Sequence, residues 1–376
     1  MGAGMAYFEA QARDLADLAE RSRARRLAAR AGRDFSSNDY LALAGDPALA
    51  AAVRDAIDAG VPIGSGGSRL LRGNHEAHEA LETEAAAFFS AESALYFSTG
   101  YAANAALLAT LPQRGDLIVH DALVHASAHE GMRLGRAEVR AAAHNDVGDF
   151  EDAILDWRHA GGTGRVWIAV ESLYSMDGDR APLADLAALA DRHEAILLAD
   201  EAHATGVFGA NGRGLAAALA GRENLITLHT CGKALGGEGA LLCGPQVVRD
   251  FLINRGRAFI FSTAPSPLMA AAVSAALRLI AEPERRARLQ ALIARAEALL
   301  APVGVQATGS QILPLVLGED ARTMAAAAAL QDLGFDVRGI RPPTVPAGTS
   351  RLRISLTLNV DETDVAALAD ALGSIA

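Results

Sequence analysis

Five short, unbroken apolar runs, separated by segments of helical pattern, constrain the fold of this chain more than any other feature of its sequence. The runs cover residues 94–97, 117–120, 166–170, 196–199 and 225–228. Strands exposed on one face alternate apolar and polar residues, whereas strands covered on both faces are continuously apolar. The alternation of such runs with helices therefore predicts an α/β fold with a mainly parallel sheet covered by helices.

The residue composition and the predicted secondary structure change on both sides of this region. The first forty residues are rich in arginine and helical in pattern, and they end in a turn at 35–40. After about residue 267, a long helix is followed by two strand candidates, 312–316 and 351–356, with a helix between them. We predict an N-terminal helical segment at 1–40, a large domain at 41–270 and a smaller α+β domain at 271–376.

Charge and apolar content exclude several classes of partner. The chain carries 45 acidic and 34 basic residues and a net charge of −11, which argues against nucleic acid or an anionic membrane as the main partner. The N-terminus has no apolar signal core, and the apolar stretches are too short to span a bilayer. Two cysteines, Cys231 and Cys243, make no disulfide framework, so we expect a cytoplasmic protein.

One lysine stands out among the basic residues. Of the 34, 33 are arginine and one is lysine, Lys233. Surface positive charge can be carried by either residue, but only lysine offers a primary amine that a suitable site can deprotonate and turn into a nucleophile. Lys233 is therefore a candidate catalytic residue. Survival of a single lysine by chance remains the alternative on composition alone.

Three predicted strand ends carry polar groups, and such ends gather at one edge of a parallel sheet. Ser98-Thr-Gly-Tyr-Ala-Ala-Asn104 opens a helix whose free N–H groups suit an anion, although an ordinary helix cap would look the same. Asp200 and His203 follow a second strand, where an acidic cap is the alternative. Thr230-Cys-Gly-Lys233 follows a third. A phosphate site, a partner for a pyridinium nitrogen and a reactive lysine together predict pyridoxal phosphate (PLP) as cofactor.

Other cofactor motifs are absent or incomplete. The glycines of Gly64-Ser-Gly-Gly-Ser68 lack the third glycine of a dinucleotide fingerprint, and the chain has no phosphate-binding P-loop. Two histidine pairs, His75 with His78 and His125 with His129, do not have the His-Glu-x-x-His spacing of a zinc site. We interpret His75, His78 and His129 as solvated or helix-capping side chains, and we predict no metal.

The chain resembles the α-oxoamine synthase family of fold-type-I PLP enzymes over nearly its full length. The matching stretches are Phe35-Ser-Ser-Asn-Asp-Tyr-Leu41, Gly64-Ser-Gly-Gly-Ser-Arg-Leu-Leu71, His144-Asn-Asp-Val147, Tyr174-Ser-Met-Asp-Gly-Asp179, Asp200-Glu-Ala-His-Ala-Thr-Gly206 and Thr230-Cys-Gly-Lys233. A further stretch, Ile340-Arg-Pro-Pro-Thr-Val-Pro-Ala-Gly-Thr349, is similar to the branch that uses L-alanine. The resemblance implies a large PLP-binding domain with a mainly parallel, seven-stranded-type sheet and a smaller C-terminal α+β domain.

The resemblance also implies roles for single residues. Lys233 would bind the cofactor covalently, Asp200 would pair with its ring nitrogen, and His203, with Ser175 nearby, would reach its ring oxygen. His125 would stack on the ring, act as a second proton-handling group and lie against the substrate. The remaining cofactor contacts would be Gly100, Tyr101, Thr230 and, from a partner subunit, Thr263 of the Ser262-Thr263 pair. The remaining substrate contacts would be Asn38 and Arg341 at the amino-acid carboxylate and Thr344 near the acyl group.

The implied activity is that of an acyltransferase in biotin biosynthesis. L-alanine would condense with a pimeloyl thioester, carried by CoA or by a carrier protein, with loss of CO2 and release of the thiol. A homodimer with sites shared across the interface is implied as well. One N-terminal arginine, Arg23, Arg25 or Arg26, would meet the acyl substrate, and the sequence leaves the choice open. The alternatives are a sister synthase that condenses glycine with a short acyl-CoA and a non-catalytic binding protein on the same scaffold.

Overall fold

A computed structural model describes residues 6–375 of the chain, which fold into two compact units. The larger unit comprises Asn38–Ser175 and Asp179–Arg288. The smaller unit comprises Met176–Gly178, the residues up to Ser37 and those from Leu289 onward. The predicted division treats 1–40 as a separate segment and begins the smaller domain at 271. The first five residues of that segment and residue 376 lie outside the described part of the chain.

A seven-stranded sheet forms the centre of the larger unit, in the order β2-β8-β7-β6-β5-β3-β4. Each strand is parallel to its neighbours except β8, which runs antiparallel to both β2 and β7. The strands are β2 (Ser93–Phe97), β3 (Leu117–Asp121), β4 (Glu138–Ala142), β5 (Val166–Glu171), β6 (Ile196–Asp200), β7 (Leu225–Thr230) and β8 (Ala240–Gly244).

Both faces of this sheet are covered, because successive side chains of a strand point to opposite faces. In β5, Val166, Ile168 and Val170 lie in one apolar cluster, with residues of α6 and α7. Trp167 and Ala169 of the same strand lie in a second cluster, with residues of α4, α5, α8 and α9. The continuous apolar runs therefore arise from burial on two sides, as the sequence predicts.

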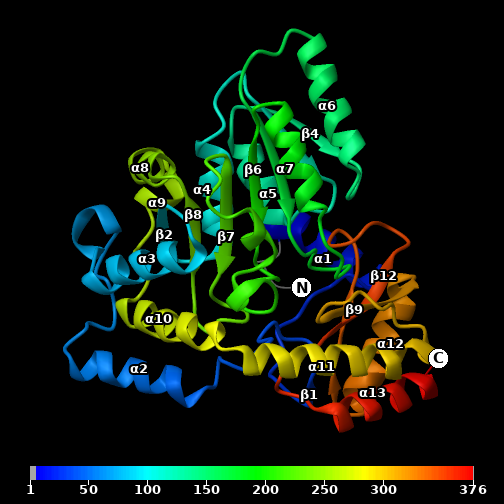
Figure 1. Ribbon diagram of the computed structural model, residues 1–376. Helices are drawn as coiled ribbons and strands as arrows, with labels where there is room; N and C mark the ends of the chain where they lie inside the picture. Colours follow the sequence, from blue (N-terminus) through cyan, green and yellow to red (C-terminus); the bar gives the residue numbers. More distant parts are fainter. Residues whose placement is uncertain (1–5, 376) are drawn as a thin grey trace. The chain divides into compact units, whose positions relative to one another are not determined.

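Helices α4 to α7 connect successive strands of the sheet in the larger unit (Figure 1). Side chains cap the first turns of helices in this unit: Thr99 caps α4, His125 caps α5 and His75 caps α3. The helices are α2 (Pro47–Asp58), α3 (Glu76–Phe89), α4 (Gly100–Thr110), α5 (Ala126–Leu134), α6 (Val147–His159), α7 (Leu183–Arg192), α8 (Gln246–Arg255), α9 (Arg257–Ile260) and α10 (Pro267–Ala281).

The smaller unit contains a three-stranded antiparallel sheet in the order β11-β12-β9 and a two-stranded parallel pair of β1 with β10. Its strands are β1 (Arg33–Asp34), β9 (Ile312–Gly318), β10 (Phe335–Asp336), β11 (Arg338–Ile340) and β12 (Ser350–Ser355). Its helices are α1 (Glu9–Glu20), most of α11 (Pro283–Leu300), α12 (Asp320–Asp332) and α13 (Glu362–Ile375). Within residues 6–375, no helix has both the length and the apolar content to cross a membrane.

Candidate active site

A cavity of about 330 Å³ lies in the larger unit, where the parallel strands present their carboxyl ends. This is the edge of an α/β sheet at which ligands bind, and the volume is within the usual range for small-molecule sites. Residues that follow β2, β3, β6 and β7 meet there. The predicted site residues that line the cavity are Asn38, Gly100, Tyr101, His125, Asp200, His203, Thr230 and Lys233.

The first turn of α4 and Thr230 form one wall of this cavity. The Thr99 hydroxyl accepts a hydrogen bond from the Ala102 N–H at 3.0 Å, which fixes the start of the helix. A Cβ atom at Gly100 would lie 2.6 Å from Cγ2 of Thr230, so only glycine allows this approach. The remaining N–H groups of a helix start attract anions. This wall can therefore hold a phosphate group.

Asp200 is held in place by two hydrogen bonds at the end of β6. Its Oδ2 accepts from Nδ2 of Asn104 at 2.8 Å, and its Oδ1 accepts from the backbone N–H of Ala202 at 2.9 Å. These two donors fix the orientation of the carboxylate. Asn104 stands in the helix-opening stretch that the sequence singles out, but its link to Asp200 joins α4 to β6 and has no sequence signal.

His125 is connected to Asp200 through the same asparagine. Nδ2 of Asn104 donates to the Ser127 hydroxyl at 3.0 Å, and that hydroxyl lies 2.8 Å from Nδ1 of His125. The Ser127 N–H also donates to Nδ1, at 3.2 Å. An Nδ1 that accepts these bonds leaves the imidazole proton on Nε2. Burial lowers the pKa of His125; the negative charge of Asp200 opposes this, and the positive charge of Lys233 adds to it.

Glu171, at the end of β5, is a buried carboxyl group that the sequence analysis missed. It pairs with Asp200 in the register of β5 and β6 and lines the cavity. Burial raises its pKa to about 8, and the nearby charge of Asp200 adds to the rise. The backbone N–H groups of Ser175 and His125 oppose it, while its Oε1 has no hydrogen-bond partner in the described structure. Its place directly after the apolar run 166–170 is the signal that could have identified it.

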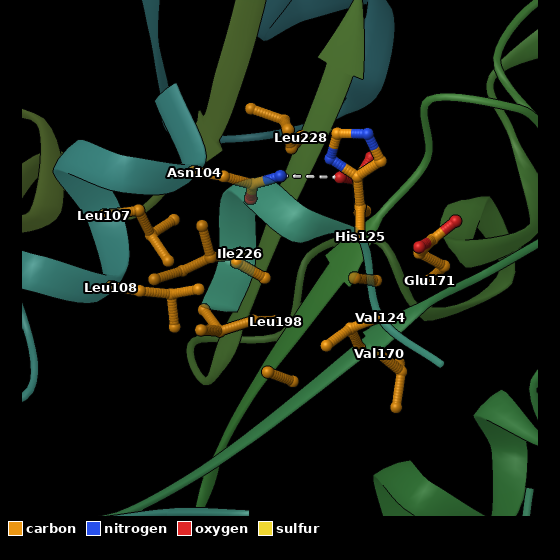
Figure 2. A pocket seen from close by; sticks show the side chains of 14 residues that line it. Asn104, Leu107, Leu108, Val124, His125, Val170, Glu171, Leu198, Ile226 and Leu228 are labelled. Carbon is orange, nitrogen blue, oxygen red and sulfur yellow. Dashed lines mark hydrogen bonds between the residues drawn. The ribbon is translucent and has the colours of Figure 1, made fainter. Parts of the chain in front are cut away.

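An apolar wall lies behind these polar groups. A small cavity of about 20 Å³ is lined by Leu107, Leu108, Leu198 and Ile226 as well as by His125 and Glu171. Figure 2 shows the leucine and isoleucine side chains on one side of the view and His125 and Glu171 on the other. Apolar surroundings strengthen the electrostatic interactions of nearby charged groups. The wall therefore favours close pairing between Asp200 and a cationic ring nitrogen.

His203 and Asn38 are joined by a third buried residue, Tyr40. The Tyr40 hydroxyl lies 2.6 Å from Nδ1 of His203 and donates to Oδ1 of Asn38 at 3.0 Å. The Tyr40 side chain has no exposed surface, and His203 is 5% exposed. Tyr40 lies within the stretch 35–41 that resembles the family, but no sequence pattern predicts a role for it.

Four predicted site residues do not line the cavity. Ser175 follows β5 and its backbone N–H bonds Glu171, while Thr263 follows α9. Arg341 and Thr344 belong to the smaller unit. There, Nη2 of Arg341 donates to the Ala24 carbonyl at 2.6 Å, and burial lowers the pKa of this guanidinium. The parts of these four residues in binding stay predictions.

The three N-terminal arginines are also in the smaller unit. Nε of Arg23 bonds Oδ2 of Asp320 at 2.7 Å. The charge of Arg25 contributes to the lowered pKa of Arg341, and Arg26 is exposed. Their part in acyl binding stays a prediction.

The residues of the cavity fit PLP. The close approach of Gly100 and Thr230 leaves a wall suited to phosphate, Asp200 offers an oriented carboxylate, and Lys233 lines the same space. Within residues 6–375, no group of three or more histidine, cysteine, aspartate or glutamate side chains is arranged to hold a metal ion. His75 caps α3, and Nε2 of His78 bonds the Pro265 carbonyl at 2.9 Å.

Two curated proteins similar to this chain carry the same name. The chain is 48% identical over 348 residues to the 8-amino-7-oxononanoate synthase of Burkholderia thailandensis, with 90% of this chain and 87% of the relative covered. It is 46% identical over 347 residues to the 8-amino-7-oxononanoate synthase of Anaeromyxobacter dehalogenans, with 91% and 86% covered. The family described as aminotransferase class I and II matches residues 32–372.

Solved structures share the fold. A serine palmitoyltransferase of S. paucimobilis, solved with a bound PLP–myriocin aldimine, is 26% identical and superposes with a TM-score of 0.87. The match covers 99% of this chain and 98% of the palmitoyltransferase chain. The 8-amino-7-oxononanoate synthase of Francisella tularensis is 27% identical and superposes with a TM-score of 0.77. The match covers 91% of this chain and 97% of the synthase chain. The predicted α/β fold of PLP fold-type-I enzymes is thereby confirmed.

Proposed function

The chain belongs to the aminotransferase class I and II family, and on that premise we propose that it condenses L-alanine with a pimeloyl thioester in biotin biosynthesis. The reaction forms a carbon–carbon bond between the alanine Cα and the thioester carbonyl carbon. It breaks the C–S bond of the thioester and the bond between the alanine Cα and its carboxyl carbon, which releases the thiol, CO2 and 8-amino-7-oxononanoate. The observation that carries the proposal is the meeting of Lys233, Asp200, His203 and His125 in one cavity. The curated relatives indicate the substrates.

PLP is the cofactor, and when bound it supplies an electron sink for negative charge at the amino-acid Cα. The amine of Lys233 takes the proton from that carbon and later returns it. The Asp200 carboxylate, oriented by Asn104 and the Ala202 N–H, would pair with the ring nitrogen of the cofactor. The wall formed by Gly100 and Thr230 holds the phosphate.

The other side chains position the substrates. His125 presents an Nε2–H to the cavity and remains neutral near pH 7, because burial lowers its pKa. It is thus able to donate a hydrogen bond to the oxygen of the thioester as negative charge develops there. Asn38 lines the cavity and is the proposed contact of the amino-acid carboxylate, while Arg341 and Thr344 stay predicted substrate contacts.

We propose a homodimer in the cytoplasm. Large apolar side chains are exposed on two segments that a backbone hydrogen bond from Ala264 to Gly67 joins at 2.8 Å. Exposed large apolar side chains are found at protein interfaces, and Thr263 lies in the second of these segments. The free thiols of the chain suit a reducing compartment. The exposed side chains are Ile63, Leu70, Leu71 and Phe261.

Thiol release from pimeloyl-CoA tests the function. We expect the PLP-loaded protein to release CoA with L-alanine and not with glycine, and the amino ketone to appear in equal amount. Release with glycine and a short acyl-CoA instead would assign the sister activity. If pimeloyl-CoA is inert, the pimeloyl carrier protein is the second donor to test, and inactivity with both refutes the proposal.

Lys233→Arg provides the matched variant for this assay. It retains the positive charge but removes the primary amine, so we expect turnover to be lost while the folded structure remains. Cofactor absorbance and circular dichroism distinguish loss of the amine from loss of folding. Turnover in this variant would contradict the role of Lys233.

A further inference from the structure

His78 is a buried side chain of the larger unit that lies outside the candidate active site. It belongs to the first turn of α3, has no exposed surface and does not line the cavity. A solvated side chain, one of the two interpretations from the sequence, is therefore wrong for His78. Its two ring nitrogens connect the start of α3 to a segment nearly two hundred positions further along the chain.

The hydrogen bonds of His78 have only one possible direction. Nε2 lies 2.9 Å from the carbonyl oxygen of Pro265, which can only accept, so Nε2 donates. Nδ1 accepts from the backbone N–H of His75 at 3.3 Å. A neutral imidazole has one N–H and one acceptor nitrogen, and burial lowers the pKa of His78 to about 4. The neutral side chain therefore satisfies both bonds at once.

Pro265 lies between two residues that are held by the glycine-rich loop 63–68. The Ala264 N–H donates to the Gly67 carbonyl at 2.8 Å. The Ser266 hydroxyl donates to a carbonyl at the start of the same loop at 2.5 Å. Three successive residues are thus fixed by hydrogen bonds, and the middle one is fixed by His78.

The anchor that α3 provides is more rigid than the anchors in the loop. Residues 64–67 include three glycines and are exposed or half-buried, and glycine adopts many backbone conformations. His78 instead projects from a helix, and Glu82, one turn further on, forms a buried ion pair with Arg69 at 2.8 Å. α3 therefore fixes both Pro265 and the residue that follows the loop.

The anchored segment leaves Thr263 on the surface. Ala264 is buried, whereas Thr263 is exposed. Within the described part of the chain, the Thr263 hydroxyl makes no hydrogen bond. Thr263 is the predicted cofactor contact for a partner subunit, and it lies only two residues before Pro265. The bond from His78 therefore limits the positions that this hydroxyl can take.

We propose that His78 is a positioning residue that, through Pro265, holds Thr263 in place for the phosphate of the cofactor in the partner subunit. His78 touches neither cofactor nor substrate, and its effect falls on the active site of the other chain. This inference rests on the proposed homodimer with shared sites. It does not depend on which amino acid or thioester the enzyme uses.

Two substitutions separate the two hydrogen bonds of His78. The side-chain nitrogen of Gln can take the place of Nε2 and donate to Pro265, whereas the shorter Asn retains only the bond from the His75 N–H. Loss of one buried hydrogen bond predicts that His78→Asn raises the Kd for PLP by about three- to tenfold, and His78→Gln should restore most of the affinity. His75→Ala is the control. It removes a cap of the same helix, so it should lower thermal stability without changing the Kd.

Mixed dimers show which active site is affected. Each mixed dimer is isolated after co-refolding of two chains that carry different affinity tags. Lys233→Ala prevents covalent attachment of PLP, so the absorbance of attached PLP reports only the site with an intact Lys233. With His78→Asn and Lys233→Ala on different chains, we expect the Kd of the unsubstituted protein. With both substitutions on one chain, we expect the raised Kd.

Hydrogen exchange adds a measurement that needs no variant, so a variant that fails to fold does not remove the test. The Ala264 amide should be protected in the unsubstituted protein by its bond to Gly67, and it should exchange faster in His78→Asn. Rapid exchange at Ala264 in the unsubstituted protein would overturn the proposal.

Three further results would contradict the role of His78. They are an unchanged Kd for PLP in His78→Asn, an equally raised Kd in His78→Gln, and a raised Kd only when the two substitutions are on different chains. A monomeric protein would refute the homodimer and this proposal with it. If the enzyme binds PLP but does not use L-alanine, the proposed function fails, while exchange and PLP titration still decide the role of His78.

Discussion

Glu171 and Glu201 are both buried carboxyl groups next to Asp200, but their hydrogen bonds differ. Oε1 of Glu171 has no partner in the described structure. Both oxygens of Glu201 accept backbone hydrogen bonds, from Leu215 at 2.8 Å and from Ala216 at 2.6 Å. A neutral amide should therefore be tolerated at Glu171 and not at Glu201.

We predict that Glu171→Gln stabilises the protein above pH 8. The pKa of Glu171 rises from its ordinary 4.5 to about 8 on folding, chiefly because of burial. Below pH 4.5 the group is protonated in both states and has no effect. Between pH 4.5 and 8 only the unfolded chain releases the proton, so the free energy of unfolding falls progressively. Above pH 8 this decrease in stability is complete. The amide removes this loss.

Denaturant unfolding of the cofactor-free protein at pH 5 and at pH 9 measures the effect. The advantage of Glu171→Gln should be larger at pH 9. Glu201→Gln is the comparison: burial raises the pKa of Glu201 as well, to about 7, but the amide leaves one of two backbone N–H donors without an acceptor, so we expect a smaller gain at pH 9 than for Glu171→Gln. An equal response of Glu171→Gln at both pH values would show that Glu171 ionises normally.

At the scale of residues, the sequence predicts the side chains that line the cavity better than the residues that position them through hydrogen bonds. Lys233 is identifiable because it is the single lysine, and Asp200 and His203 because they follow an apolar run. Asn104 and Tyr40 act through hydrogen bonds to residues 96 and 163 positions away. No local pattern encodes such a pairing, so these supports appear only in the folded structure.

At the scale of elements, the approach of α4 to the end of β7 shapes the phosphate wall. We predict that Gly100→Ala weakens PLP binding by about tenfold, because the added Cβ would lie 2.6 Å from Thr230 and overpacking of this kind costs about 1–3 kcal/mol. Equilibrium titration with PLP measures the change. Gly45→Ala is the control, since its Cβ would meet nothing within 4 Å. Equal affinities in the two variants would contradict the assignment of this wall.

His144 joins β3 to the loop that carries Ser175. Its Nδ1 bonds Asp121 at 2.9 Å and its Nε2 bonds Asp179 at 2.8 Å. Burial lowers the pKa of His144, but the two carboxylates outweigh it and raise the pKa to about 10. The two ion pairs of protonated His144 therefore stabilise the fold fully below pH 6.5, the pKa of the unfolded group. This stabilisation is lost as the pH rises through about 10.

We predict that His144→Gln lowers the unfolding free energy by about 2 kcal/mol at pH 6, a typical value for a hydrogen bond to a charged group. The difference from the unsubstituted protein should shrink between pH 6.5 and 10. Chemical denaturation across this range gives the measurement. His159→Gln replaces an exposed histidine and should have little effect at any pH. A difference that does not depend on pH would show that His144 is neutral in the folded state.

The elements themselves were predictable where packing leaves a clear pattern. All five apolar runs are strands of the observed sheet. The strands β4 and β8 were not predicted. β4 is an edge strand with several exposed residues and so has no continuous apolar run. β8 is five residues long and directly follows a glycine-rich turn, which obscures its start.

At the scale of the whole molecule, the proposed homodimer with shared sites predicts the behaviour of mixed dimers. We predict that Lys233→Ala and Thr263→Tyr chains, each with little activity alone, regain activity when unfolded and refolded together. A mixed dimer would have one site with both residues intact, so random pairing gives about a quarter of full activity. Mixing without unfolding is the control. No recovery after co-refolding would show that Thr263 serves its own chain.

The division into units was less predictable than the fold class. β1 pairs with β10, so residues 33–34 bond residues 335–336. A two-residue strand has no recognisable periodicity, and its partner is three hundred positions away. The N-terminal residues therefore look like an independent segment in the sequence, although they pack with the C-terminal ones.

The position of β8 in the sheet has a consequence for synthesis of the chain. β2 is the first strand of the sheet to be translated, but its one partner within the sheet is β8, and Ser93 bonds Gly244 across 151 positions. Gly100 follows β2, and Thr230 precedes the turn that leads into β8. A nascent chain that ends before residue 240 lacks β8, the strand that lies between β2 and β7 in the sheet. Gly100 and Thr230 are therefore not yet held next to each other. Binding of the PLP phosphate at this wall therefore requires a chain that has been synthesised at least through β8.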